Sequence, residues 1–233
     1  MSVRNLLLIG LPVAALSFGC AKSPLQAEGV VTTTRTTTST STTTSVIPDL
    51  VGAVAAVAPK GTGVAAATVF SFSLGTPPAG GVPPYTQAWT FGDGAEGAGV
   101  SPSHLFLSPG VFTTILTTTD SRGISAKTTA PVVVGTVTGR WYAEFGGFQP
   151  EGLDIIQNAA ALTVTINDTT NLLGFAAGTG SLANPRMMSV SATFGGLTPF
   201  AGTFIGTLDE NLKVWSGVVT GYSGCPCSFT ASR

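Results

Sequence analysis

The chain has 233 residues, of which only 9% are charged, and its ten basic and eleven acidic residues nearly cancel. This length accommodates one large domain or two ordinary domains, each with its own hydrophobic core. The near-neutral balance, without a cluster of Lys and Arg, excludes the charge pattern of a nucleic-acid-binding protein. Gly, Thr, Ser, Ala and Val dominate the composition and favour short strands and tight turns, so we expect an all-β chain of two domains.

Residues 1–19 have the layout of a signal peptide. A single cation, Arg4, precedes an apolar run over residues 6–16, and a short segment then leads to Cys20. The apolar run is shorter than the ~20 residues that a membrane-spanning helix needs. We therefore expect residues 1–19 to be removed when the chain is exported to the cell envelope.

Cys20 follows Gly19 at the end of this apolar run. The arrangement resembles the lipobox of bacterial lipoproteins, in which the cysteine is acylated and becomes the mature N-terminus. It departs from that family at Ser17, where the family prefers Leu, and at the bulky Phe18. The resemblance implies a lipid anchor at the outer membrane or cell surface, to which each buried methylene contributes ~0.8 kcal/mol. The alternative is a secreted protein in which Cys20 is a stray thiol.

Residues 32–45 consist of Thr and Ser with one exception, Arg35. Such a run has no apolar face to bury, so nothing offsets the entropy of ordering it. We expect residues 20–47 to form a solvated, lipid-anchored linker, and its hydroxyl groups are candidate sites for O-glycosylation.

Hydrophobic residues with the two-residue period of strands begin after the linker. Predicted strands cover residues 67–73, 86–91 and 111–120, and the Gly/Pro-rich residues 76–85 form a loop. Strands of this length between tight turns are typical of an antiparallel sandwich.

Residues 89–110 raise the question of a reactive site, because they contain Asp93 and the single histidine of the chain, His104. As an acid/base pair or as metal ligands, these two residues would need a further carboxylate, histidine or activated serine. No such partner is recognisable in the sequence. In the structural interpretation, the aromatic side chains of this segment enter a hydrophobic core. The Gly-Asp-Gly sequence forms a tight turn, because glycine accepts positive φ and aspartate hydrogen-bonds nearby backbone amides.

The same region reads "WTFGDG", then "PSHLF", then "PGVFTTILTTTDSRG". This series resembles the PKD (polycystic kidney disease) domain, an immunoglobulin-like β-sandwich found on bacterial surface proteins and secreted hydrolases. The matching residues are Trp89, Phe91, Gly92, Asp93, Gly94, Pro102, His104, Pro109, Gly110, Leu116, Asp120 and Gly123. Phenylalanine replaces two tyrosines of the family pattern, at Phe106 and Phe112, and threonine replaces two valines, at Thr114 and Thr118.

The PKD resemblance covers residues 48–135 and implies a structural role for His104. Some relatives bind calcium near strand ends, where Asp49, Asp93 or Asp120 would be the ligands here. A hard cation needs about six oxygen ligands from converging carboxylates, so we expect neither a metal site nor a cofactor.

Residues 137–233 form a second domain that resembles no family as a whole. Predicted strands cover residues 139–145, 161–166, 187–194, 200–208, 212–221 and 227–232, and residues 209–211 suit a hairpin turn. An antiparallel meander of six to eight strands hides its edges by closing into a barrel or folding into a sandwich.

The segment "TGRWY" at residues 138–142 is similar to the opening strand of lipocalin-like barrels. That similarity implies an interior that holds a small apolar ligand. The alternative, which we favour, is an interior filled by the domain's own aromatic side chains, namely Trp141, Phe145, Phe194, Phe204, Trp215 and Phe229.

Two cysteines, Cys225 and Cys227, lie close to the C-terminus. In an oxidising compartment they are candidates for a disulfide across Pro226. Reduced thiols are a second reading, and a metal site is the third, since a metal would need two more soft ligands.

The order of these parts favours a non-enzymatic cell-envelope lipoprotein that displays a PKD domain and a second β-domain for adhesion. Its partner would be a surface protein or a polysaccharide. One alternative is a small-ligand barrel. Another is an enzyme of the glycoside-hydrolase type, which would need two carboxylates ~5 to 9.5 Å apart in the second domain. The acidic candidates there are Glu144, Glu151, Asp154, Asp168, Asp209 and Glu210, with Arg140 nearby in sequence.

Overall fold

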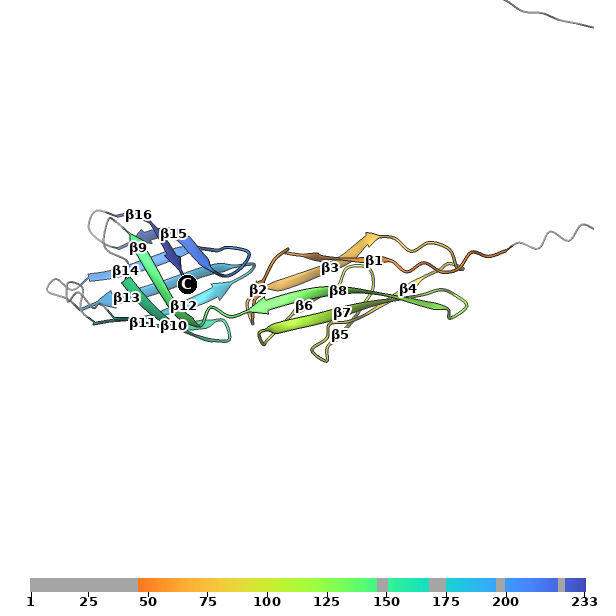
Figure 1. Cartoon of the computed structure of the whole chain (residues 1–233), viewed down its shortest axis with the longest axis horizontal. Helices are drawn as coiled ribbons and strands as arrows, with labels where there is room; N and C mark the ends of the chain where they lie inside the picture. Colours follow the sequence, from red (N-terminus) through yellow and green to blue (C-terminus); the bar gives the residue numbers. More distant parts are fainter. Residues whose placement is uncertain (1–45, 146–150, 168–174, 196–199, 222–224) are drawn as a thin grey trace, which may run out of the picture. The chain divides into compact units, whose positions relative to one another are not determined.

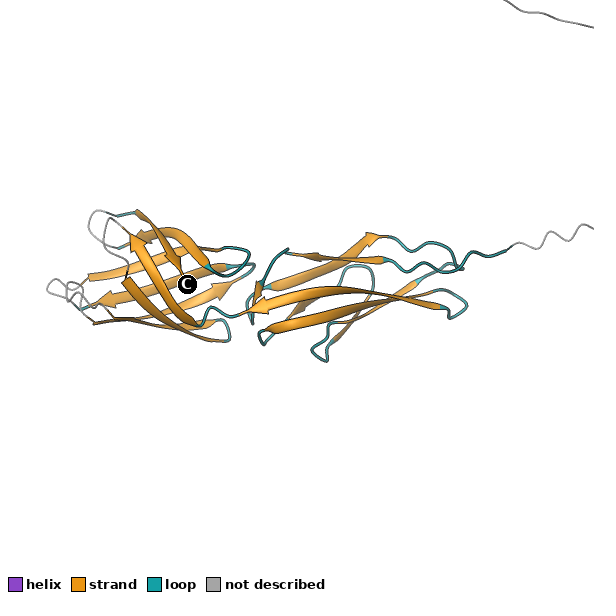
Figure 2. Ribbon diagram, in the orientation of Figure 1, coloured by secondary structure: helices purple, strands orange, loops and turns teal. Residues whose placement is uncertain are grey.

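Strands and turns make up the regular structure of the described residues, and no helix is present among them (Figure 2). The structure is a computed structural model that describes residues 46–145, 151–167, 175–195, 200–221 and 225–233. Within these ranges, no helix has the length and hydropathy that a membrane crossing requires. The predicted export signal, Cys20 and most of the Ser/Thr-rich linker lie outside the described residues.

The first half of the described chain folds into two sheets (Figure 1). One sheet has the strand order β1 (Val54–Ala58), β3 (Val69–Thr76), β6 (Ser103–Leu105). The other has the order β2 (Gly63–Val64), β8 (Ser125–Gly135), β7 (Gly110–Thr119), β4 (Thr86–Thr90), β5 (Glu96–Ala98). All pairings are antiparallel except that of β2 with β8.

The core of this sandwich is aromatic because the inward positions of its strands carry large rings. Phe70 and Phe72 alternate with exposed residues along β3. The ring of Phe72 lies 5.5 Å from Trp89 and 4.9 Å from Phe91, measured between centroids. The remaining buried members of the cluster include Phe106, Leu116, Val132 and Val134.

The second half forms a closed barrel of eight antiparallel strands, in which each strand pairs with its neighbours in sequence and the last pairs with the first. The strands are β9 (Gly139–Phe145), β10 (Glu151–Asn158), β11 (Ala161–Asn167), β12 (Phe175–Ala183), β13 (Met187–Phe194), β14 (Phe200–Leu208), β15 (Val214–Thr220) and β16 (Cys227–Ser232). A barrel of eight strands has an interior narrow enough for side chains to fill.

The barrel interior is filled in this way. The buried aromatic side chains within it are Trp141, Phe194, Phe204, Trp215 and Phe229, and Ile155, Ile166 and Met188 are buried beside them. Inward positions without a side chain make room for these rings. Gly206 lies opposite Gly217, and a Cβ at Gly217 would collide with the carbonyl oxygen of Ile205. Such glycines mark places where strands bend and approach closely.

The predicted meander is therefore a barrel, and four of its predicted strands coincide with β9, β13, β14 and β16. The sequence reading omitted β10 and β12. The Gly/Ala-rich sequence of β12, "FAAGTGSLA", has few of the large side chains that identify a strand. Of the residues expected to fill the interior, the side chain of Phe145 lies outside the described set.

Residues 45–233 form one compact unit. The stretch from β2 to β3 contributes to both cores, because Val64 and Ala67 are buried in the barrel cluster while Ala65 and Phe70 belong to the sandwich. Gln157 on β10 donates from Nε2 to the carbonyl oxygen of Ala65 over 2.8 Å. The two β-domains thus share buried side chains.

Candidate functional site

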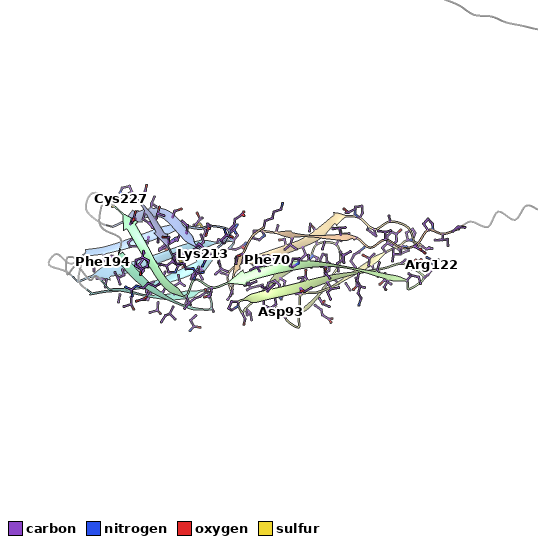
Figure 3. The ribbon with its side chains drawn as sticks, viewed as in Figure 1. Phe70, Asp93, Arg122, Phe194, Lys213 and Cys227 are labelled. Carbon is purple, nitrogen blue, oxygen red and sulfur yellow. A yellow bond between two sulfur atoms is a disulfide. The ribbon has the colours of Figure 1, made fainter. Side chains whose placement is uncertain are left out.

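Asp93 and His104 are brought together by the sandwich. Asp93 lies in the turn between β4 and β5, and His104 lies on β6 (Figure 3 labels Asp93). His104 Nε2 is 2.6 Å from Asp93 Oδ2, and the two side chains are 16% and 22% exposed. Because a carboxylate only accepts, the imidazole N–H is the donor. The two residues considered together in the sequence are thus in direct contact with each other.

Aromatic rings fix the orientation of His104. Its imidazole stacks on Phe91 with centroids 4.3 Å apart and an angle of 4° between the planes. The imidazole also makes an edge contact with Phe106, with centroids 4.6 Å apart and an angle of 83° between the planes. The histidine is therefore part of the aromatic core, with one edge turned toward Asp93.

Asp93 also organises its own turn. Its Oδ1 accepts a hydrogen bond of 3.1 Å from the backbone N–H of Ala95. Partial burial would raise the pKa of the Asp93 carboxyl, but the hydrogen bonds from His104 and Ala95 outweigh this effect and hold the pKa below its ordinary value. The carboxylate is thus ionised at neutral pH, and it fastens the β4–β5 turn to β6.

Asp120 plays a similar role at the end of β7, where its side chain is fully buried. Oδ1 accepts from the backbone N–H groups of Arg122 and Ile124, each at 2.9 Å. Oδ2 accepts from the N–H of Val82 at 3.0 Å and from Arg122 Nε at 3.1 Å. Burial would raise the pKa of this carboxyl, but the backbone donors of Ile124 and Val82 and the Arg122 guanidinium together lower it.

The three aspartates considered as calcium ligands have different surroundings. Asp93 faces an imidazole, Asp120 is surrounded by N–H donors, and Asp49 lies exposed before β1. Within the described ranges, no group of three or more His, Cys, Asp and Glu side chains is placed to hold a metal ion.

The sandwich matches a known family at the level of sequence. Residues 53–134 match the family model of the PKD domain. The match falls within the predicted interval of residues 48–135 and confirms the resemblance read from the sequence. The all-β class is likewise confirmed, with a PKD sandwich followed by a closed antiparallel barrel.

Comparisons of the whole chain with other proteins reveal no close relative. No curated protein matches its sequence. Among solved structures, it is similar to a chain described as "Structural basis for the promiscuous specificity of the carbohydrate-binding modules from the beta-sandwich super family". The alignment covers 80% of this chain and 92% of that chain, at 12% identity and a TM-score of 0.36. Values this low do not establish a common fold.

The acidic residues of the barrel lie in separate places. Asp154 on β10 accepts from Arg140 Nη1 on β9 over 3.0 Å. Asp209, after β14, accepts from the backbone N–H groups of Lys213 and Val214 at 2.6 and 2.9 Å. Burial would raise the pKa of Asp209, but these amides lower it. Of the other candidates, Glu144 and Glu210 are exposed, while Asp168 and the side chain of Glu151 lie outside the described set.

A pocket of about 200 Å³ lies in the sandwich, lined in part by Lys60, Phe70 and Pro131. The interior of the barrel, where a small ligand was considered, contains closely packed rings instead. Phe229 lies 5.4 Å from Phe204 and 4.5 Å from Trp215 between ring centroids.

A disulfide joins Cys225 and Cys227 at the start of β16. Cys225 packs against the barrel core. The bridge encloses a single residue, so it constrains the chain only locally.

Proposed function

We propose that this protein is a non-enzymatic, exported lipoprotein that presents a PKD sandwich and a β-barrel for adhesive contact with other macromolecules. Residues 1–19 direct export, acylated Cys20 holds the chain at the cell envelope, and the Ser/Thr-rich linker separates the folded unit from the membrane. The partner is a surface protein or a polysaccharide.

The observation that carries this proposal is that Asp93, His104 and Asp120 serve to hold the fold together. Asp93 contacts His104 and the amide of Ala95, and Asp120 accepts from backbone amides, so these residues fix turns of a sandwich that matches the family model of the PKD domain. A module stabilised in this way presents its faces rigidly, as an interaction domain requires.

Intact-mass analysis of the full chain, expressed in a bacterial host and extracted from membranes, tests the anchor. The proposal expects loss of residues 1–19 and a mass increase that corresponds to acyl chains on Cys20. The matched control is Cys20→Ser, which should be recovered without lipid and outside the membrane fraction.

Protease treatment of intact cells tests display. The wild-type protein should be cleaved within residues 32–45, so that the folded unit is released. A wild-type mass without lipid, or a chain that stays protected on intact cells but is cleaved after their lysis, would overturn the proposal.

A further inference from the structure

One exposed aromatic ring stands on the outer face of the barrel. Trp141 and Ala143 on β9 are buried in the interior, so Tyr142 between them points outward, and 53% of it is exposed. Among the described residues, Tyr142 is the single aromatic member of the exposed large hydrophobic residues. Single exposed hydrophobic residues are common on protein surfaces. The surroundings of Tyr142 therefore decide whether it forms a binding site.

The backbone beside Tyr142 is shaped to receive Arg140. Gly152 on β10 lies directly opposite Tyr142. A Cβ at Gly152 would collide with Arg140 Nη2 and would lie 3.1 Å from Arg140 Cζ. The guanidinium therefore lies across the bare backbone of Gly152, and its Cζ is 5.9 Å from the centroid of the Tyr142 ring.

Asp154 holds the guanidinium in this position. Arg140 lies opposite Asp154 in the β9–β10 register, and Nη1 donates to Oδ2 over 3.0 Å. Both side chains remain more than two-fifths exposed, at 43% and 41%. Arg140, Tyr142 and Asp154 together form one exposed surface on the outside of the barrel, which we name the Tyr142 platform.

Hydroxyl groups flank the platform on both sides. Ser232 on β16 lies opposite Tyr142, and Thr165 on β11 lies opposite Asp154. Since both pairs occupy outward positions of neighbouring strands, their side chains lie within reach of a ligand seated on the ring.

We propose that the Tyr142 platform binds a neutral sugar residue of a polysaccharide. A pyranose has apolar C–H faces and a rim of hydroxyl groups. The Tyr142 ring suits the apolar face, since an aromatic side chain combines a large apolar surface with a polar tip. The guanidinium and the carboxylate beside it supply fixed donors and acceptors for hydroxyl groups.

Charge gives an ionic ligand no advantage over a neutral one. The Arg140–Asp154 pair carries no net charge, so it offers an ionic sugar no net attraction in return for desolvating the charge of that sugar. Glu144, the next outward residue on β9, is exposed and adds repulsion against an anionic sugar. A single half-exposed ring buries little area, so we expect a dissociation constant of about 1 mM for one oligosaccharide. Attachment to a polymer would then depend on many copies of the protein at the cell surface.

This inference rests on the proposed function, because it names the partner of the displayed barrel. The experiment is NMR titration of the full mature chain with neutral oligosaccharides of glucose, galactose and mannose, up to about 10 mM, ten times the expected dissociation constant. Oligogalacturonate and chitosan oligomers serve as anionic and cationic probes. The expected result is binding of at least one neutral series, with weaker binding of both charged probes.

Variants assign the binding to the platform. Tyr142→Ala should weaken it by at least about tenfold, the scale of 1.4 kcal/mol. Gly152→Ala leaves the ring in place but displaces Arg140, and it should weaken binding by a smaller factor. The matched control is Ile156→Ala, an exposed residue on β10 outside the platform, which should bind as the wild type does. Tyr142→Thr provides a second variant with high strand propensity.

Several results would overturn the inference: no binding of any neutral probe, stronger binding of a charged probe, or equal binding by wild type and both Tyr142 variants. Because acylation and protease accessibility are measured separately, a correctly anchored and displayed protein that ignores saccharides would refute the platform and leave the display function standing.

Discussion

The imidazole of His104 donates a 2.6 Å hydrogen bond to the carboxylate of Asp93 while its ring stacks on Phe91. The two residues that most resemble catalytic groups in the sequence therefore join a turn to a strand. The same pattern recurs at Asp120, which gathers backbone N–H groups from two loops. These polar groups act on the backbone of the sandwich.

The two glycines that flank Asp93 should differ in their tolerance of a side chain. Both have positive φ, +89° at Gly92 and +96° at Gly94, but a Cβ at Gly92 would lie 2.8 Å from the carbonyl oxygen of Thr113, whereas Gly94 has no atom within 4 Å. Gly94→Ala should cost about 1 kcal/mol from backbone strain alone, and Gly92→Ala at least about twice as much. Urea unfolding at neutral pH measures both, and equal losses would contradict the close approach.

Asp120 should be more important for stability than an exposed aspartate of the same domain. Asp120→Ala leaves the N–H groups of Val82 and Ile124 without their acceptor, so the thermal midpoint should fall clearly. Asp49→Ala is the matched control, because Asp49 is exposed, and it should leave the midpoint unchanged. Differential scanning calorimetry compares the two variants, and similar midpoints would show that Asp120 does not hold these loops together.

Arg233 should stabilise the segment that connects the two β-domains. Its guanidinium donates to the carbonyl oxygens of Thr136 at 2.7 Å and Thr138 at 3.0 Å and lies 4.9 Å from the Trp141 ring centroid. Arg233→Met should cost about 2 kcal/mol, the scale of a charge-assisted hydrogen bond. Lys127→Met, at an exposed position of β8, should change stability by less than about 0.5 kcal/mol. Tryptophan fluorescence during urea unfolding reports both, and equal effects would refute the role of Arg233.

The disulfide should contribute little to the stability of the barrel. Its two cysteines are two positions apart in the sequence, and a loop of three residues gives about 1.6 kcal/mol in the chain-entropy estimate. The Cys225→Ser, Cys227→Ser double variant should therefore lose no more than about 2 kcal/mol in urea unfolding. A loss of the size expected for a long-loop disulfide, above about 3 kcal/mol, would mean that the bridge organises more of the barrel than its own turn.

Much of the sandwich was predictable because the residues of the PKD motif are those that local backbone geometry and core packing require. A turn that needs positive φ selects Gly92 and Gly94, and a core position selects Trp89. Contacts between distant segments leave no such record. From the sequence, Asp93 and His104 were considered together only as an acid/base pair or as metal ligands, and their contact between a turn and a strand was not predicted. Nothing in the sequence pairs Asp120 with Val82, which is 38 residues away.

In the barrel, predictability followed side-chain size. Strands with large inward residues, such as β13 with Met188 and Phe194, were recognised with the observed bounds. β12 was not recognised, because glycine occupies two of its inward positions, Gly178 and Gly180, where the neighbouring strand lies too close for a side chain. The Tyr142 platform was also missed, because it depends on Gly152 lying opposite Tyr142, a register that only the closed barrel defines.

The central claim, that Asp93 and His104 stabilise the sandwich, predicts a specific dependence on pH. The pKa of Asp93 is lowered in the folded protein, so its contribution is complete above the unfolded pKa of about 3.9 and is lost as pH falls through the folded value. The advantage of the wild type over Asp93→Asn should therefore be present at neutral pH and disappear as the medium is acidified below about pH 4.

A double-mutant cycle of Asp93→Asn and His104→Gln, followed by urea unfolding across this pH range, is the most direct measurement. The account predicts that each single variant loses about 1 to 2 kcal/mol at neutral pH, and that the pair is coupled by about 1 kcal/mol. Variants as stable as the wild type at neutral pH, with no coupling between the two positions, would contradict it.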